Sequence, residues 1–261
     1  MKNKAKIMRN MLTGMVGAAI CMTAAWLLFA YGEGNVRNGF IQSNWPKMQY
    51  IRFEIAIILF AIGVPIYAVG LRDYIKVIRM IRRRRSVLDA RMAKLFEISA
   101  NLSIVGMLFV FVSYAMMAIV YKQLFVTNLM GADIISVTEG MFYYMAIPVL
   151  AYFIISVGGL SLAFMYFIMI ERLDVSKICL LFNPLVMLGV GQLMKLVKIY
   201  YIADFGVAMV PFGYLLMMMT GLIFVAKVPE VRRERENRER DRREYDRYDR
   251  YDRYDRYDRV R

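Results

Sequence analysis

Apolar residues in this chain gather into six long runs, separated by shorter polar segments. The runs cover residues 11–31, 53–71, 99–121, 141–170, 178–199 and 205–228. A bilayer with a hydrocarbon core about 30 Å thick requires roughly 20 consecutive apolar residues from each helix that crosses it. The pattern therefore predicts an all-α integral membrane protein, a bundle of about six transmembrane helices within residues 1–228.

The first run, residues 11–31, has two interpretations. A cleavable signal peptide has an apolar core of about 7–15 residues, and this run is longer. Ile20, directly before Cys21, is also larger than the residue that lipoprotein cleavage requires. We therefore expect a retained helix, with a signal peptide as the alternative.

Two other runs depart from a simple straight span. Residues 141–170 are too many for one straight crossing and include Pro148 and the pair Gly158-Gly159, so a tilted or kinked helix is expected. Residues 178–199 form the most polar run, which contains Asn183, Gln192, Lys195 and Lys198.

Lysine and arginine are distributed unequally between alternate polar segments. Four lie in the N-terminal segment, nine in residues 72–97 and two in residues 171–177. The intervening segments together hold Arg37, Lys47, Arg52, Lys122, Lys195 and Lys198. Because cytoplasmic loops carry the excess of Lys and Arg, both chain ends are predicted to be cytoplasmic.

The densest basic stretch is Arg82-Arg83-Arg84-Arg85, between the second and third runs. Its position suffices to fix the orientation of the two flanking helices. These arginines would also attract anionic lipid headgroups, at about 1 kcal/mol per basic residue near the surface. Nucleic acid is not an expected partner, because the stretch is held against the membrane.

Residues 229–261 form a charged, low-complexity tail that ends in five copies of Tyr-Asp-Arg between Tyr245 and Arg259. We interpret it as a solvated, mostly disordered cytoplasmic segment. The alternative is an arginine–tyrosine segment that binds RNA or acidic partners through charge and stacking. The aspartate in every repeat weakens that alternative, since it nearly cancels the positive charge.

Composition argues against catalysis and against a bound metal or cofactor. The chain contains 59% hydrophobic residues and no histidine, so it lacks the commonest general base and the commonest neutral metal ligand. Cys21 and Cys179 belong to different runs and are expected to be free thiols. No Ser/His or Cys/His set and no cluster of intramembrane carboxylates is present, so we do not expect an enzyme.

Ionisable residues at membrane depth are costly and are therefore candidates for function. We hypothesise that Glu54 meets Lys195 near the outer leaflet, with Arg52 and Gln192 lining a polar pocket. Lys198 shares a helix face with Gln192 and Lys195 through its spacing of three residues. In the simpler interpretation, which we favour, the two lysines snorkel to the headgroups and Glu54 lies in the interface.

Asn183 precedes Pro184 near the inner end of the fifth run. Proline is favoured in the first turn of a helix, which would make Asn183 the N-cap, and we favour this structural role. The functional alternative is a shortened helix whose positive N-terminus faces an anionic ligand or headgroup.

Several short strings carry a family resemblance. They are Arg52-Phe53, residues 62–67 (Ile-Gly-Val-Pro-Ile-Tyr) with Gly70, Phe182-Asn183-Pro184, Gly191 and residues 193–195 (Leu-Met-Lys). Together they resemble an uncharacterised family of small polytopic bacterial membrane proteins, over about residues 11–227. The resemblance implies a bacterial inner-membrane location and about six helices, but no activity.

Three classes of function are compatible with these patterns. The first is binding or transport of a small anionic or zwitterionic molecule or a lipid, in a polar pocket near the outer face. The second is a non-catalytic accessory protein that scaffolds or regulates a membrane partner. The third, which we least expect, is a membrane enzyme. The oligomeric state is not indicated by the sequence.

Overall fold

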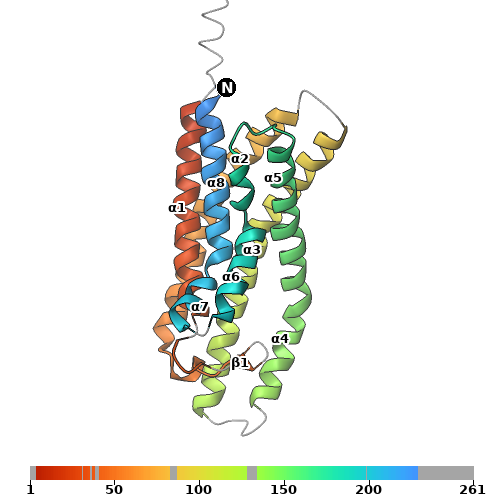
Figure 1. Ribbon diagram of the computed structural model, residues 1–261. Coiled ribbons are helices and arrows are strands. Elements are labelled where there is room, and N and C mark those ends of the chain that lie inside the picture. Colours follow the sequence, from red (N-terminus) through yellow and green to blue (C-terminus); the bar gives the residue numbers. More distant parts are fainter. Residues whose placement is uncertain are drawn as a thin grey trace, which may run out of the picture.

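The computed structural model describes residues 4–30, 32–35, 37–38, 41–82, 87–127, 134–197 and 199–228, which form an elongated helical bundle (Figure 1). The helices are α1 (Lys4–Phe29), α2 (Tyr50–Arg82), α3 (Val87–Thr127), α4 (Ile134–Ala151), the π-helix η3 (Tyr152–Gly159), α5 (Leu160–Met169), α6 (Pro184–Leu196), α7 (Tyr200–Gly206) and α8 (Met209–Lys227). The remaining described elements are two antiparallel strands of two residues each, β1 (Arg37–Asn38) and β2 (Ile41–Gln42), and the 3-10 helices η1 (Trp45–Lys47) and η4 (Lys177–Leu181).

Five helical segments among the described residues are long and apolar enough to cross a membrane. They are Lys4–Phe29, Tyr50–Met80, Val87–Thr127, Ser136–Met169 and Met209–Lys227. Helix α6 is apolar but has only 13 residues, about 20 Å at 1.5 Å per residue. The sequence-based prediction of a helical membrane protein is therefore confirmed in its coarse form, with one segment shorter than predicted.

The helices α2 and α3 extend well beyond their apolar runs. Helix α2 continues to Arg82 and α3 begins at Val87, so most of the basic segment 72–97 is helical and not a loop. Backbone hydrogen bonding continues in a helix whether its side chains face hydrocarbon or water, and hydropathy therefore does not locate its end. Of the predicted headgroup-binding arginines, Arg82 ends α2, while Arg83, Arg84 and Arg85 lie outside the described residues.

Helices α1 and α2 pack at very short range through glycines. A β-carbon added to Gly17 would lie 2.2 Å from the backbone nitrogen of Tyr67. One added to Gly14 would lie 2.7 Å from the α-carbon of Gly70. Small residues allow helix backbones to approach closely in membranes, where burial in lipid supplies no hydrophobic drive between helices. These glycines make α1 and α2 a tightly packed pair.

The long fourth run has an internal change of helix type. Pro148 lies inside α4, and the chain becomes a π-helix at Tyr152 before α5 resumes at Leu160. Proline removes one backbone donor and displaces the carbonyl of the preceding turn, and π-segments occur where the regular ladder is interrupted. The run that was predicted to tilt or kink is thus helical as far as Met169, with a change of helix type inside it.

The first and last described helices lie side by side, and their free ends meet at one end of the bundle (Figure 1). The Nζ of Lys4 donates to the carbonyl oxygens of Ala226 and Val228, at 2.6 and 2.8 Å. These bonds satisfy orphan carbonyls at the end of α8. Cys21 and Cys179 are both free and buried, as the sequence predicts.

At the opposite end, the segment between α1 and α2 folds back onto the bundle. Trp45 is fully buried, its ring packed against Tyr114 and Tyr121 of α3 and Phe142 of α4. Lys122 donates to the carbonyl of Pro46 at 2.6 Å. This segment closes the end of the bundle where the candidate site lies.

Candidate functional site

Two neighbouring cavities lie around helix α6. The first has a volume of about 600 Å³ and is bounded by α6, α7 and the segment that follows α1. The second, of about 230 Å³, lies between α3, α4 and η3 on one side and α6, α7 and α8 on the other. Ligand pockets typically measure about 300–1,000 Å³, so the first cavity could hold a small molecule and the second only part of one.

Gln192 and Lys195 are the residues that the two cavities share. They lie three positions apart on α6, which places both side chains on one helix face. Lys195 is half-buried. The sequence-based hypothesis singled out the same two residues as part of a polar pocket, and the structure places both at cavity walls.

The cavities differ in chemistry. The larger one is lined by glycines and polar groups, such as Asn35 and Tyr200, together with aliphatic side chains. The smaller is lined mainly by apolar side chains, such as Phe111 and Val210. A chamber of mixed polarity therefore adjoins a mainly apolar one, and Gln192 and Lys195 line both.

Asn35 contributes a hydrogen-bond donor to this region. Its Oδ1 accepts from the backbone N–H of Asn44 and the hydroxyl of Ser43, both at 3.2 Å. Because the backbone N–H of Asn44 can only donate, the amide atom of Asn35 that faces it must be the oxygen. The other amide atom is therefore the donor Nδ2. That Nδ2 is buried and has no hydrogen-bond partner among the described residues. A buried donor without a partner is costly, so this position favours an acceptor.

Arg52 makes a different set of contacts from those predicted. Its Nε donates to the carbonyl of Leu27, and its Nη2 to that of Ala30 at 3.2 Å, which ties α2 to the end of α1. The carboxylate whose charge acts on Arg52 is Asp204 of α7. Asp204 is buried and accepts from the N–H of Gly32 at 3.2 and 3.1 Å. Arg52 and Asp204 thus hold the segment that forms one wall of the larger cavity.

Tyr200 also lines the larger cavity and remains uncharged at cellular pH. The pKa of Tyr200 is raised to about 12. The main cause is its hydrogen bond with Tyr201, and burial and the nearby charges of Glu33 and Asp204 contribute less. The phenol therefore contributes a polar but neutral group to the wall.

A family model described as a family of unknown function, DUF6796, matches residues 1–228. The chain belongs to this family. The match covers all the helices described above and leaves the Tyr-Asp-Arg tail outside, and it confirms the resemblance to an uncharacterised family. No curated protein and no solved structure matches this DUF6796 chain.

Glu54 and Lys198 are two further predicted site residues of the DUF6796 protein, and neither is placed at the cavity walls by the described structure. Glu54 has an exposed side chain on α2 and lines neither cavity. Lys198 lies outside the described residues. The structure therefore brings Gln192 and Lys195 together at the cavities, and places Arg52 nearby through Asp204, but does not add Glu54 to this group.

Asn183 is the N-cap of α6. It is fully buried, its Oδ1 accepts from the N–H groups of Leu185 and Val186 at 3.0 Å each, and its Nδ2 donates to Leu180. The predicted cap is confirmed. The N–H of Leu185 also donates to Ser161 at 3.1 Å, so donors at this helix end already have protein partners.

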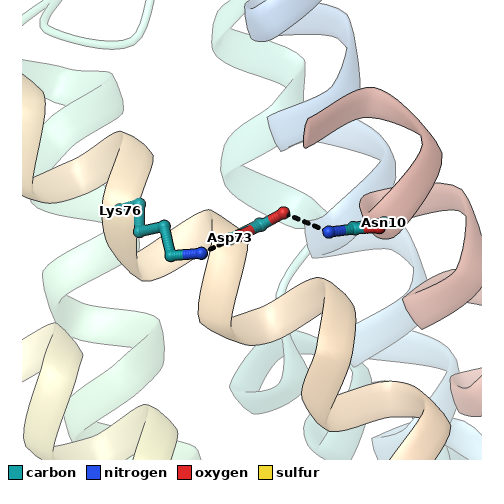
Figure 2. Close-up of polar contacts among 3 residues, drawn as sticks. All are labelled: Asn10, Asp73 and Lys76. Atoms are coloured by element: carbon teal, nitrogen blue, oxygen red, sulfur yellow. Dashed lines mark hydrogen bonds and ion pairs between the residues drawn. The ribbon is translucent and has the colours of Figure 1, made fainter. Parts of the chain in front are cut away.

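Another buried carboxylate of the DUF6796 fold, Asp73 of α2, lines neither cavity. It is 3% exposed, accepts from Asn10 of α1 at 2.6 Å, and pairs with Lys76 at 2.5 Å (Figure 2). Its charge is thus balanced by its own helix. No group of three or more potential metal ligands occurs among the described residues.

Sequence reasoning missed Asp204, Asn35 and Asp73. Asp204 directly precedes the sixth apolar run, which is a signal that could have been used. Asn35 gives no such signal, because its role depends on a turn that brings Ser43 and Asn44 to it.

Proposed function

We propose that this DUF6796 protein is a multi-pass protein of the bacterial cytoplasmic membrane that binds a small anionic or zwitterionic molecule or a lipid. The observation that carries the proposal is the pair Gln192 and Lys195, which lines both cavities. A cationic side chain among polar groups and glycines, beside an apolar chamber, suits a ligand with a negatively charged group.

The proposal includes six membrane crossings with both ends in the cytoplasm. Lys4 contacts the end of α8, so the described chain starts and finishes at one end of the bundle. Five long helices alone are an odd number of crossings, and η4 with α6 would supply the sixth. The basic residues of α2 and α3 would then face the cytoplasm, and Arg82–Arg85 would meet anionic headgroups there.

Native mass spectrometry of the detergent-purified protein tests the binding proposal. The wild type is expected to retain a small anionic or zwitterionic molecule or a lipid. Lys195→Met should lose it, because the cationic group at the cavity wall is removed. Lys47→Met is the matched control, since Lys47 is exposed at the same end of the bundle and lines neither cavity. A wild type that carries no bound molecule, or a Lys195→Met variant that retains it fully, would refute the proposal.

The second candidate function is a non-catalytic accessory role through a membrane partner. The outer face of α4 supports it, because Tyr143, Tyr144 and Ile147 are 80–85% exposed. Exposed aromatic and apolar side chains at this density occur at interaction surfaces as well as at lipid-facing ones. Co-purification of one stoichiometric partner, lost on Tyr144→Ala and unaffected by Lys195→Met, would favour this role over ligand binding.

A further inference from the structure

The two cavities together have the form of a site for an amphiphile. The larger one, of about 600 Å³, offers polar groups, whereas the smaller one, of about 230 Å³, is walled mainly by apolar side chains. A wholly polar metabolite would have no use for the apolar chamber, because burying polar groups there without hydrogen bonds costs free energy. A molecule with one charged end and one hydrocarbon end would fill both.

Charge and hydrogen-bond complementarity identify the sign of the polar end. Lys195 lines both cavities and brings a positive charge to them. The Nδ2 of Asn35, which is buried and unpartnered among the described residues, adds a donor beside the larger cavity. Donors and a cation suit a phosphate or carboxylate oxygen.

The apolar chamber also has a buried polar side chain in its wall. Gln42 lines it, is 3% exposed, and has a buried Oε1 without a hydrogen-bond partner among the described residues. Because Gln42 and Lys195 both line this chamber, it is polar at part of its wall and apolar elsewhere. The unpartnered Oε1 would be satisfied by a donor such as a headgroup hydroxyl, because ester oxygens are themselves acceptors.

We infer that the cavities bind one anionic phospholipid, with its phosphate at Lys195 and Asn35 and a segment of one acyl chain in the apolar chamber. This inference rests on the proposed binding function and specifies its ligand class. A chamber of about 230 Å³ holds only part of a chain, so the rest of the lipid remains in contact with the bilayer.

A titration of the full-length protein in detergent, followed by native mass spectrometry, tests the inference. The probes are dioleoyl phosphatidylglycerol, dioleoyl phosphatidylcholine with the same chains, and glycerophosphoglycerol, which has the same headgroup without chains. We expect phosphatidylglycerol to bind at least tenfold more tightly than either comparison molecule. Equal binding of glycerophosphoglycerol would overturn the lipid assignment while sustaining the proposed function, and equal binding of phosphatidylcholine would overturn the anionic one. Absence of binding by all three, with nothing retained by the purified protein, would defeat both proposals.

A matched pair of variants tests the acyl-chain position. Val149→Phe places a larger side chain in the apolar chamber, whereas Ile147→Phe introduces the same side chain two residues away on the exposed face of α4. Val149→Phe is expected to weaken phosphatidylglycerol binding at least fivefold, and Ile147→Phe to leave it unchanged. Equal effects of the two would contradict the assignment.

Photo-crosslinking of the wild-type protein with a phosphatidylglycerol that has a photoreactive acyl chain tests the position of the chain without any substitution. Adducts on the wild-type protein are expected at chamber residues such as Phe111 and Leu188. Adducts confined to the exposed face of α4, around Ile147 and Leu150, would show ordinary bilayer contact and overturn the inference.

Discussion

At the scale of single residues, Asp204 is the acid on which the candidate site depends. Asp204 is buried and accepts a hydrogen bond from the N–H of Gly32 in the cavity wall. Its negative charge also interacts electrostatically with the guanidinium of Arg52. Removal of a buried charged acceptor leaves its hydrogen-bond donors unsatisfied, which costs about 1–3 kcal/mol of stability. We therefore expect Asp204→Asn to lower the free energy of unfolding by about that amount in thermal scanning of the purified protein.

Glu54→Gln is the control for Asp204→Asn, because Glu54 is an exposed acid and the replacement is the same. Its effect should stay within about 0.5 kcal/mol. Equal destabilisation by the two substitutions would mean that Asp204 has no special role. Combining Asp204→Asn with Arg52→Met should give less than the sum of the single effects, since the two residues are coupled.

Helical spacing within one segment led to the hypothesis that Gln192 and Lys195 share a polar pocket, and both residues line the two cavities. The acidic partner proposed for this region, Glu54, is exposed, and the buried acid near Arg52 belongs to α7. Spacing relates residues on one helix, whereas the electrostatic influence of Asp204 on Arg52 depends on how the whole bundle places α2 and α7. No periodicity encodes that placement.

At the scale of elements, the start of α6 is set by one side chain. Asn183→Ala removes the two capping bonds to Leu185 and Val186 inside the bundle. Loss of an N-cap costs about 0.5–2 kcal/mol, and thermal scanning should show a corresponding fall in stability. Ser176→Ala is the control, because Ser176 precedes η4 without a side-chain cap bond. A stable Asn183→Ala variant would contradict the capping role.

The close packing of α1 and α2 gives a second prediction at this scale. Gly17→Ala forces a β-carbon to within 2.2 Å of the Tyr67 backbone, so the helices must separate, at about 1–3 kcal/mol. Gly140→Ala on α4 meets nothing within 4 Å and should be neutral or stabilising by up to about 1 kcal/mol. The ratio of folded to aggregated protein after heating measures both. A tolerated Gly17→Ala would argue against this helix contact.

Helix ends were the least predictable elements. The apolar runs located the five long helices, because hydrocarbon demands continuous apolar residues. They could not locate where α2 ends, because its backbone hydrogen bonds continue into polar solvent. The start of α6 was indicated by a different signal, Asn183 before Pro184, and not by the apolar run.

At the scale of the whole molecule, the proposed topology can be read by cysteine accessibility. Cys21 and Cys179 are buried, so the wild-type background should be low. Gln49→Cys introduces an exposed thiol before α2, and Ser176→Cys introduces one between α5 and η4. In intact cells, a membrane-impermeant maleimide is expected to label Gln49→Cys alone, and both variants after permeabilisation. The reverse pattern, or labelling of both in intact cells, would overturn the proposed orientation.

The contact between α1 and α8 has a consequence for how the protein is made. A ribosome produces α1 first and α8 last, yet Met11 and Tyr74 close around Gly221 and Lys4 binds the end of α8. Part of the surface of α1 therefore stays uncovered until α8 has been synthesised. Chains terminated before Met209 should be substrates for membrane quality-control proteases, whereas chains terminated after Val228 should survive. Loss of α8 would then shorten the cellular half-life, whereas loss of the Tyr-Asp-Arg tail would leave it unchanged.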